Sequence, residues 1–142
     1  MAAKPLVQEF LRAHIPDEPG QTELYKWAIG NTLSEVADDI VFPDLTAIVR
    51  DKRHGSAREM VAVALCRMKN PEAVGVLIGL LREGDLAGHA LVALGRLKAE
   101  MARPYIEPCL EHEMPWVRAE ARKALAKIER ASRRRNATFQ QR

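Results

Sequence analysis

The sequence predicts an all-α protein, a right-handed α-solenoid built from stacked antiparallel helix pairs. One apolar pattern occurs three times, in MVAVALCRMKNP, HALVALGRLKAE and EARKALAKIERA, and places Ala64-Leu65, Ala93-Leu94 and Ala124-Leu125 at intervals of 29 and 31 residues. Repeats of this period are typical of stacked helical units. Aromatic residues make up only 5% of the chain, which favours helices over sheets.

Each copy of the pattern predicts the first helix of a pair. Val61, Ala64, Leu65 and Met68 follow the i, i+3, i+4, i+7 spacing of a helix with one buried face, and the later copies repeat that spacing. A helix pair alone buries one face, whereas stacked pairs bury a continuous core. We therefore expect nearly full burial of the central leucines, which are Leu65, Leu94 and Leu125.

The second helices are predicted from capping signals and proline. Asn70 is a candidate N-cap, and Pro71 suits the first helical position because its missing N–H is not needed there. Pro104 can open the next second helix, whereas Pro108 inside it predicts a kink or a late start. In order, the predicted helices are 5–14, 22–36, 43–52, 56–69, 71–82, 86–98, 102–112 and 115–132.

Charge and composition divide the chain into three parts. Residues 1–20 are predicted to form an N-terminal capping helix and loop, residues 21–131 the repeat domain, and residues 132–142 a disordered basic tail. Residues 117–142 hold nine Lys or Arg and two Glu, whereas residues 1–116 hold 13 basic and 17 acidic side chains. No apolar run approaches the roughly 20 residues of a membrane span. Without a secretory signal pattern at the start, and with only two cysteines, we expect a cytoplasmic protein with no membrane association.

The segments MPWVRAEARKALAKIE and GSAREMVAVALCRMKNPEAVGVLIGLL resemble HEAT repeats of the short type found in phycobilisome-lyase-like proteins. Arg58 and Arg118 occupy the arginine position of that pattern, and Ala87 departs from it. The resemblance covers residues 21–131 and implies an armadillo-like superhelix that binds or scaffolds other proteins. It also carries precedents for DNA binding, and its name suggests a bilin lyase.

The first functional hypothesis is a non-enzymatic protein-binding module that uses the concave face of the second helices. Gly75 and Gly79 lie four residues apart in one predicted helix. Each glycine destabilises that helix by about 1 kcal/mol relative to alanine. They either pack tightly against a neighbouring helix or form a low floor in the groove. A basic or helical protein or peptide would suit the expected groove residues, which are Asp44, Glu72, Gly75, Gly79, Arg82, Glu107 and Glu111.

Two basic segments suggest other contacts. The first, RDKRHGSAR, contains Arg50, Lys52, Arg53, His54 and Arg58. It suits a helix C-terminus followed by glycine, and it could also form an anion-binding patch. The second is the basic tail, whose arginines suggest nucleic-acid binding as the alternative function. These arginines are Arg130, Arg133, Arg134 and Arg135.

The sequence contains no motif typical of catalysis, a cofactor or a metal site. Cys66 and Cys109 fall on expected buried stripes, where cysteine commonly serves as a small apolar residue. Cys109 and His112 have the spacing of a zinc-binding pair but lack a second pair. We therefore expect no cofactor, no metal and no enzymatic activity, with a bilin lyase-like enzyme as the remaining alternative.

Overall fold

The computed structural model describes residues 2–14 and 20–141, and this part of the chain is all-α with no strand. The α-helices are α1 (Ala3–Arg12), α2 (Gln21–Val36), α3 (Phe42–Arg50), α4 (Arg58–Ala64), α5 (Glu72–Leu80), α6 (Gly84–Leu97), α7 (Arg103–Ile106) and α8 (Pro115–Gln140). Short 3₁₀ segments join them at Asp39–Val41, Lys52–Ala57, Leu65–Arg67, Glu100–Ala102 and Glu107–Glu111. No helix in these ranges combines the length and the apolar character needed to cross a bilayer.

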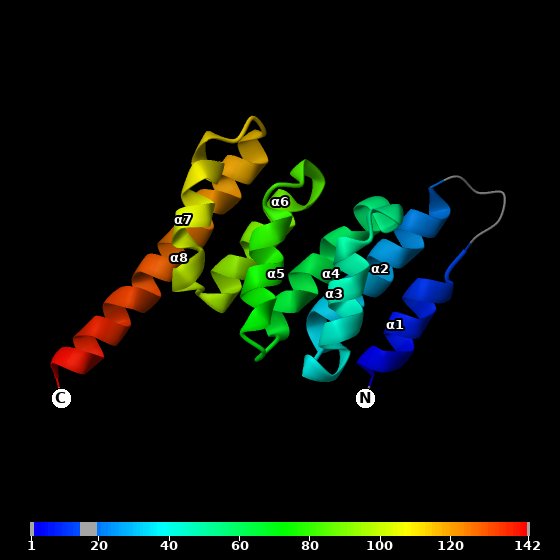
Figure 1. Ribbon diagram of the computed structural model, residues 1–142, viewed down its shortest axis with the longest axis horizontal. Helices are drawn as coiled ribbons and strands as arrows, with labels where there is room; N and C mark the ends of the chain where they lie inside the picture. Colours follow the sequence, from blue (N-terminus) through cyan, green and yellow to red (C-terminus); the bar gives the residue numbers. More distant parts are fainter. Residues whose placement is uncertain (1, 15–19, 142) are drawn as a thin grey trace.

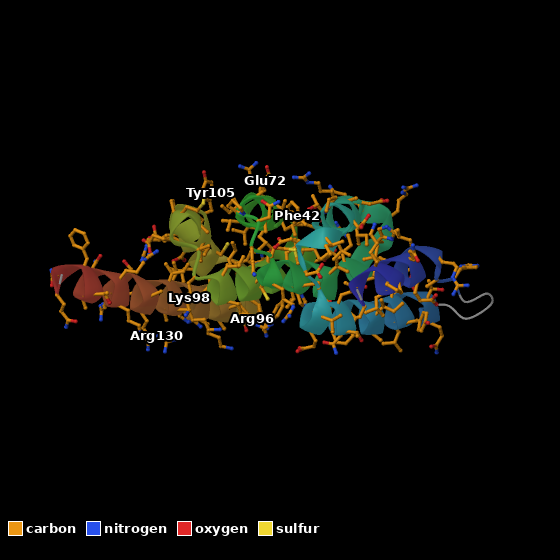
Figure 2. The ribbon with its side chains drawn as sticks, turned by 90° about the horizontal axis from the view of Figure 1, so that it is seen from below. Phe42, Glu72, Arg96, Lys98, Tyr105 and Arg130 are labelled. Atoms are coloured by element: carbon orange, nitrogen blue, oxygen red, sulfur yellow. The ribbon has the colours of Figure 1, made fainter. Side chains whose placement is uncertain are left out.

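The helices form two layers along an elongated molecule (Figure 1). In the first layer, α2, α4, α6 and α8 pack successively against one another. In the second layer, α3, α5 and α7 each pack on the helix that follows them in the chain. The two layers are visible edge-on in Figure 2, with Phe42, Glu72 and Tyr105 on one side and Arg96, Lys98 and Arg130 on the other.

The repeated apolar pattern forms the core between the layers. Leu65 and Leu94 are fully buried, as the sequence predicts. Leu125 is only half-buried, so the prediction of nearly full burial is wrong for the third copy. The reason is its position in α8, because within residues 2–14 and 20–141 α8 packs on α6 and α7 and no further helix pair lies on its other side.

Two glycines allow the first-layer helices to approach closely. A Cβ atom on Gly30 would lie 3.0 Å from the Cβ of Met60, so glycine lets α2 approach α4. A Cβ atom on Gly88 would lie 2.0 Å from the indole ring of Trp116, which fills the space above that glycine. Neither contact is visible in the apolar periodicity, because it depends on which helices become neighbours.

The repeat arginines bind the turns that precede their helices. Arg58 donates hydrogen bonds to the carbonyl oxygens of Val49 and Gly55, at 2.9 and 3.0 Å. Arg118 in α8 likewise donates to the carbonyl oxygens of His112 and Glu113, at 2.6 and 3.0 Å. These carbonyl groups lie at or beyond helix ends, where the helix supplies no partner. The arginine position therefore has a structural role in both copies.

Most helix boundaries agree with the sequence prediction, and three differences are informative. Residues 52–57 are a 3₁₀ segment with Gly55 at φ 55°, so the helix predicted from 56 begins at Arg58. The predicted kink at Pro108 is present, because α7 ends at Ile106 and continues as the 3₁₀ segment Glu107–Glu111. The last helix extends to Gln140 rather than ending near residue 132, and its final turns project beyond the other helices (Figure 1).

Candidate functional site

The candidate site is a groove on the outer side of the second layer, with α5 as its floor. Gly75 and Gly79 lie one turn apart on this helix, and a Cβ atom added to either would meet, beyond the surrounding backbone of α5, no heavy atom of the described residues within 4 Å. Tight helix packing therefore does not explain these glycines. They leave open space instead, as expected for the floor of a groove.

The larger hollow of this groove lies between α5 and α7 and has a volume of about 600 Å³. Ile78 and Leu81 give it an apolar base, and Pro104, Tyr105 and Pro108 line its other side. Pro108 shapes this wall because it has no N–H to donate and its ring opposes a continuous helix. A hollow of this size, mostly apolar with a few polar groups, is typical of ligand-binding pockets.

Polar groups mark one end of the larger hollow. Arg82 and His112 both line it, and Arg82 is exposed to solvent. The Nδ1 atom of His112 accepts a hydrogen bond from the backbone N–H of Met114 at 3.1 Å, which fixes the ring. Cys109 also lines the hollow, and burial raises the pKa of its thiol. A thiol with a raised pKa is a poor nucleophile at neutral pH.

A second hollow of about 350 Å³ lies between α3 and α5 and shares Gly75 with the first. Phe42 and Val76 supply its apolar surface, and Arg50 and Glu72 supply charges of opposite sign. Thr46 also lines it, although its hydroxyl oxygen is buried and has no hydrogen-bond partner among the residues described. The two hollows together form a groove across α3, α5 and α7, on the side where Figure 2 labels Phe42, Glu72 and Tyr105.

The groove contains four of its seven predicted residues. Gly75, Gly79 and Arg82 line the larger hollow, and Glu72 lines the smaller one. The other three acidic residues, Asp44, Glu107 and Glu111, line neither hollow. Glu72 is therefore the one predicted acidic residue that lines either hollow among the described residues, and the lining of the larger hollow includes no carboxylate of these residues.

Sequence reasoning missed Thr46, Pro104 and Tyr105 as groove residues. The available signal for Tyr105 was an aromatic side chain on a second helix between two prolines. The structure leaves this tyrosine 54% exposed, which suits a contact residue better than a core residue.

The predicted basic patch does not form one surface. Arg58 is 3% exposed and binds Glu83 at 2.9 Å, so it belongs to the interior. The side chain of Arg53 binds Asp51, which raises the pKa of Arg53 and lowers that of Asp51 through their hydrogen bonds. His54 packs edge-on against Phe10, with ring centroids 5.3 Å apart. Only Arg50 and Lys52 remain exposed without an ion pair in the described residues, so local helix-end contacts account for most of the segment.

The basic tail is also divided by its contacts. Arg133 pairs with Glu129 at 2.9 Å, and Arg135 lies 3.8 Å from Glu100. Arg130 and Arg134 have no carboxylate within ion-pair distance in the part of the chain that is described, and they line a common hollow with Lys98. The four arginines therefore face two sides of α8.

Nothing among the described residues gathers three His, Cys, Asp or Glu side chains closely enough to hold a metal ion. The thiols of Cys66 and Cys109 are free. The groove can therefore offer apolar contact, the guanidinium groups of Arg50 and Arg82 and the carboxylate of Glu72 to a ligand. In comparisons with known proteins, no family model matches this chain and no curated protein matches it.

Proposed function

We propose that the chain is a short HEAT-like α-solenoid that binds a protein or peptide in the groove across α3, α5 and α7, without catalysing a reaction. The observation that carries this proposal is the pair of hollows joined at Gly75, over a helix surface that two glycines keep open. A groove made of two neighbouring hollows can accept the side chains on one face of a peptide or an amphipathic helix.

The lining of the larger hollow favours an apolar or aromatic anchor. Ile78, Leu81, Tyr105 and the two prolines offer apolar surface, and such pockets commonly hold the residues that contribute most to binding. Arg82 at the rim favours an acidic residue next to that anchor, because no carboxylate of the lining neutralises it. The ligand in this hollow is therefore apolar and acidic, rather than basic.

The smaller hollow favours a side chain that combines apolar surface with a polar group. Phe42 and Val76 offer apolar contact there, and Arg50 and Glu72 offer charges of opposite sign to polar atoms of the peptide. The free thiols Cys66 and Cys109 fit a reducing compartment, so we place this activity in the cytoplasm.

A display selection with a random-peptide library tests the proposal. The selected peptides should combine an aromatic or large aliphatic residue with a nearby Asp or Glu. Gly79→Leu should abolish their binding because the new side chain fills the hollow, although it increases helix propensity and has room in the fold. Arg82→Glu should weaken binding of the acidic peptides at least about tenfold.

The matched control is Ala126→Leu, which adds the same side chain to an exposed position on α8 in the other layer. It should leave the affinity within about twofold of wild type. Selection of no peptide, or of peptides that bind Gly79→Leu and wild type equally, would rule out the groove as the binding site.

A further inference from the structure

A second surface lies on the first layer, away from the groove, and gathers several cations. The end of α6 contributes Arg96 and Lys98, and α8 contributes Lys127, Arg130 and Arg134. Among the described residues, none of these five has a carboxylate within ion-pair distance, whereas Arg103, Lys123, Arg133 and Arg135 each have at least one. Figure 2 shows Arg96, Lys98 and Arg130 on the same side of the molecule. We name these five residues the basic surface.

Close packing of α6 against α8 brings the charges together. A Cβ atom on Gly95 would lie 3.1 Å from the Cα of Ala124 and 3.5 Å from the Cδ of Lys127, so the stem of Lys127 lies against the last turns of α6. Lys98, Lys127, Arg130 and Arg134 then line one hollow of about 130 Å³. Four cations around one hollow repel each other, which favours an anion between them.

The stripe on α8 has a regular spacing. Lys127, Arg130 and Arg134 follow the i, i+3, i+7 pattern of one helix face. At a rise of about 1.5 Å per residue, their attachment points are about 4.5 and 6 Å apart along the axis. The surface is therefore a short row of cations rather than a single anion pocket.

The backbone of Lys98 is the second observation. Lys98 has φ 52° and ψ 44°, and it is the only non-glycine residue with a positive φ in the described ranges. Its N–H bonds to the Gly95 carbonyl at 3.1 Å, and the N–H of Ala99 bonds to the Leu94 carbonyl at 3.3 Å. This pair of bonds is the Schellman motif, whose left-handed position usually holds glycine because other residues are strained there.

Glycine occupies the other described positive-φ positions, Gly20 and Gly55. A lysine kept in a glycine conformation, with its side chain in a basic hollow, indicates that the charge itself is used. The negative end of the α6 dipole explains cations at Arg96 and Lys98, because that position favours them. It does not explain Lys127, Arg130 and Arg134, which come from within α8.

We propose that the basic surface binds the phosphate backbone of a nucleic acid. Nucleic acids present a dense, regular line of negative charge that a row of lysines and arginines can neutralise. Protein interfaces, in contrast, usually have large apolar or aromatic residues at their centre and few lysines. The described part of the chain lines this hollow with no large apolar side chain, since Ala131 is the only uncharged residue that it places there. These side chains would contact the charged phosphates and not the edges of the bases, so the binding is independent of the nucleotide sequence.

Fluorescence anisotropy with a short labelled DNA duplex tests this proposal on the full chain. The triple variant Lys127→Gln/Arg130→Gln/Arg134→Gln should bind at least about tenfold more weakly at low salt. The slope of log affinity against log salt concentration should fall by about 2 to 3 with the loss of three phosphate contacts.

The Lys98→Gly variant distinguishes an effect on DNA affinity from an effect on protein stability. Glycine relieves the left-handed backbone, so the variant should melt at or above the wild-type temperature while its affinity falls about threefold or more. Arg122→Gln is the matched control, because it removes one charge from an exposed position of α8 outside the hollow. It should change the affinity less than about twofold.

Three results would overturn the proposal. The first is the absence of duplex binding at low salt. The second is an equal loss of affinity in Lys98→Gly and Arg122→Gln, which would reflect net charge alone. The third comes from competition, if poly-glutamate displaces the labelled duplex as effectively as unlabelled duplex does at the same concentration of charge. That result would assign the surface to an acidic protein.

Discussion

Arg58 binds Glu83 in the interior of the protein, with Nη1 2.9 Å from Oε2 and Arg58 only 3% exposed. The same guanidinium group donates to the Val49 and Gly55 carbonyl oxygens. Arg58 therefore connects the end of α3, the following turn and the residue before α6. A charge buried in this way is tolerated because each of its contacts is a polar group that also needs a partner.

Replacing Arg58 with Ala should lower the free energy of unfolding by about 3–5 kcal/mol, because it breaks a buried ion pair and leaves carbonyl groups without donors. Urea denaturation followed by circular dichroism measures this loss. Arg53→Ala is the control, because its ion pair with Asp51 lies at the surface, and it should cost less than about 1 kcal/mol. Similar losses in both variants would show that Arg58 is not part of the interior.

Gly88→Ala should destabilise the protein by about 1–3 kcal/mol, because the added methyl group would overlap the indole ring of Trp116. The ring must move away from Gly88, which changes its edge-on contact with His89, now at 5.0 Å between centroids. Tryptophan fluorescence should report this movement as a change in emission. Gly75→Ala is the matched control and should stabilise by about 0.5–1 kcal/mol, because it improves helix propensity without a clash.

Leu94→Ala should cost about 2–5 kcal/mol, since Leu94 is fully buried at the centre of the repeat. Leu125→Ala should cost clearly less, because Leu125 is half-buried at the uncovered end of the first layer. Thermal melting of the two variants compares the equivalent position in two copies of the repeat. Equal losses would mean that a further packing partner covers α8.

The difference between Leu94 and Leu125 shows how far periodicity predicts structure. Apolar spacing identifies which face of a helix is buried, and it placed Leu65 and Leu94 correctly. It says nothing of whether another helix covers that face, so it failed at Leu125. Together with capping signals and prolines, this spacing predicted most helix ends, except where 3₁₀ segments replace α-helical turns and where α8 continues to Gln140.

Side-chain partners were the least predictable feature. Arg58 occurs in a basic segment of the sequence, but its acid lies 25 residues later, in the turn before α6. Lys98 and Lys127 share a hollow only because Gly95 permits close packing of α6 and α8. The repeat alignment offered a signal that these two lysines are neighbours. Lys98 aligns with Glu129 of the last copy, and Lys127 precedes Glu129 by two residues.

Two histidines should make stability depend on pH. Burial lowers the pKa of His89 and outweighs the opposing effect of the carboxylates of Glu59 and Glu120. Burial also lowers the pKa of His54, with Lys26, Arg53 and Arg58 acting in the same direction and Asp51 opposing them. In the unfolded chain both histidines regain an ordinary pKa of about 6.5. The unfolded state therefore binds protons more readily than the folded state in this range, and stability falls as pH decreases below about 6.5.

The free energy of unfolding, measured by urea denaturation between about pH 7.5 and 5.5, should decrease toward the acidic end of this range. Most carboxylates stay ionised there, because their ordinary pKa values lie near about 4. His54→Gln/His89→Gln should flatten the pH dependence even if it lowers stability at every pH, because the groups that take up protons on unfolding are gone. His14→Gln is the control, since His14 is exposed, and it should leave the slope unchanged. A wild-type protein with no slope in this window, or equal flattening by His14→Gln, would show that the two buried histidines do not control the pH response.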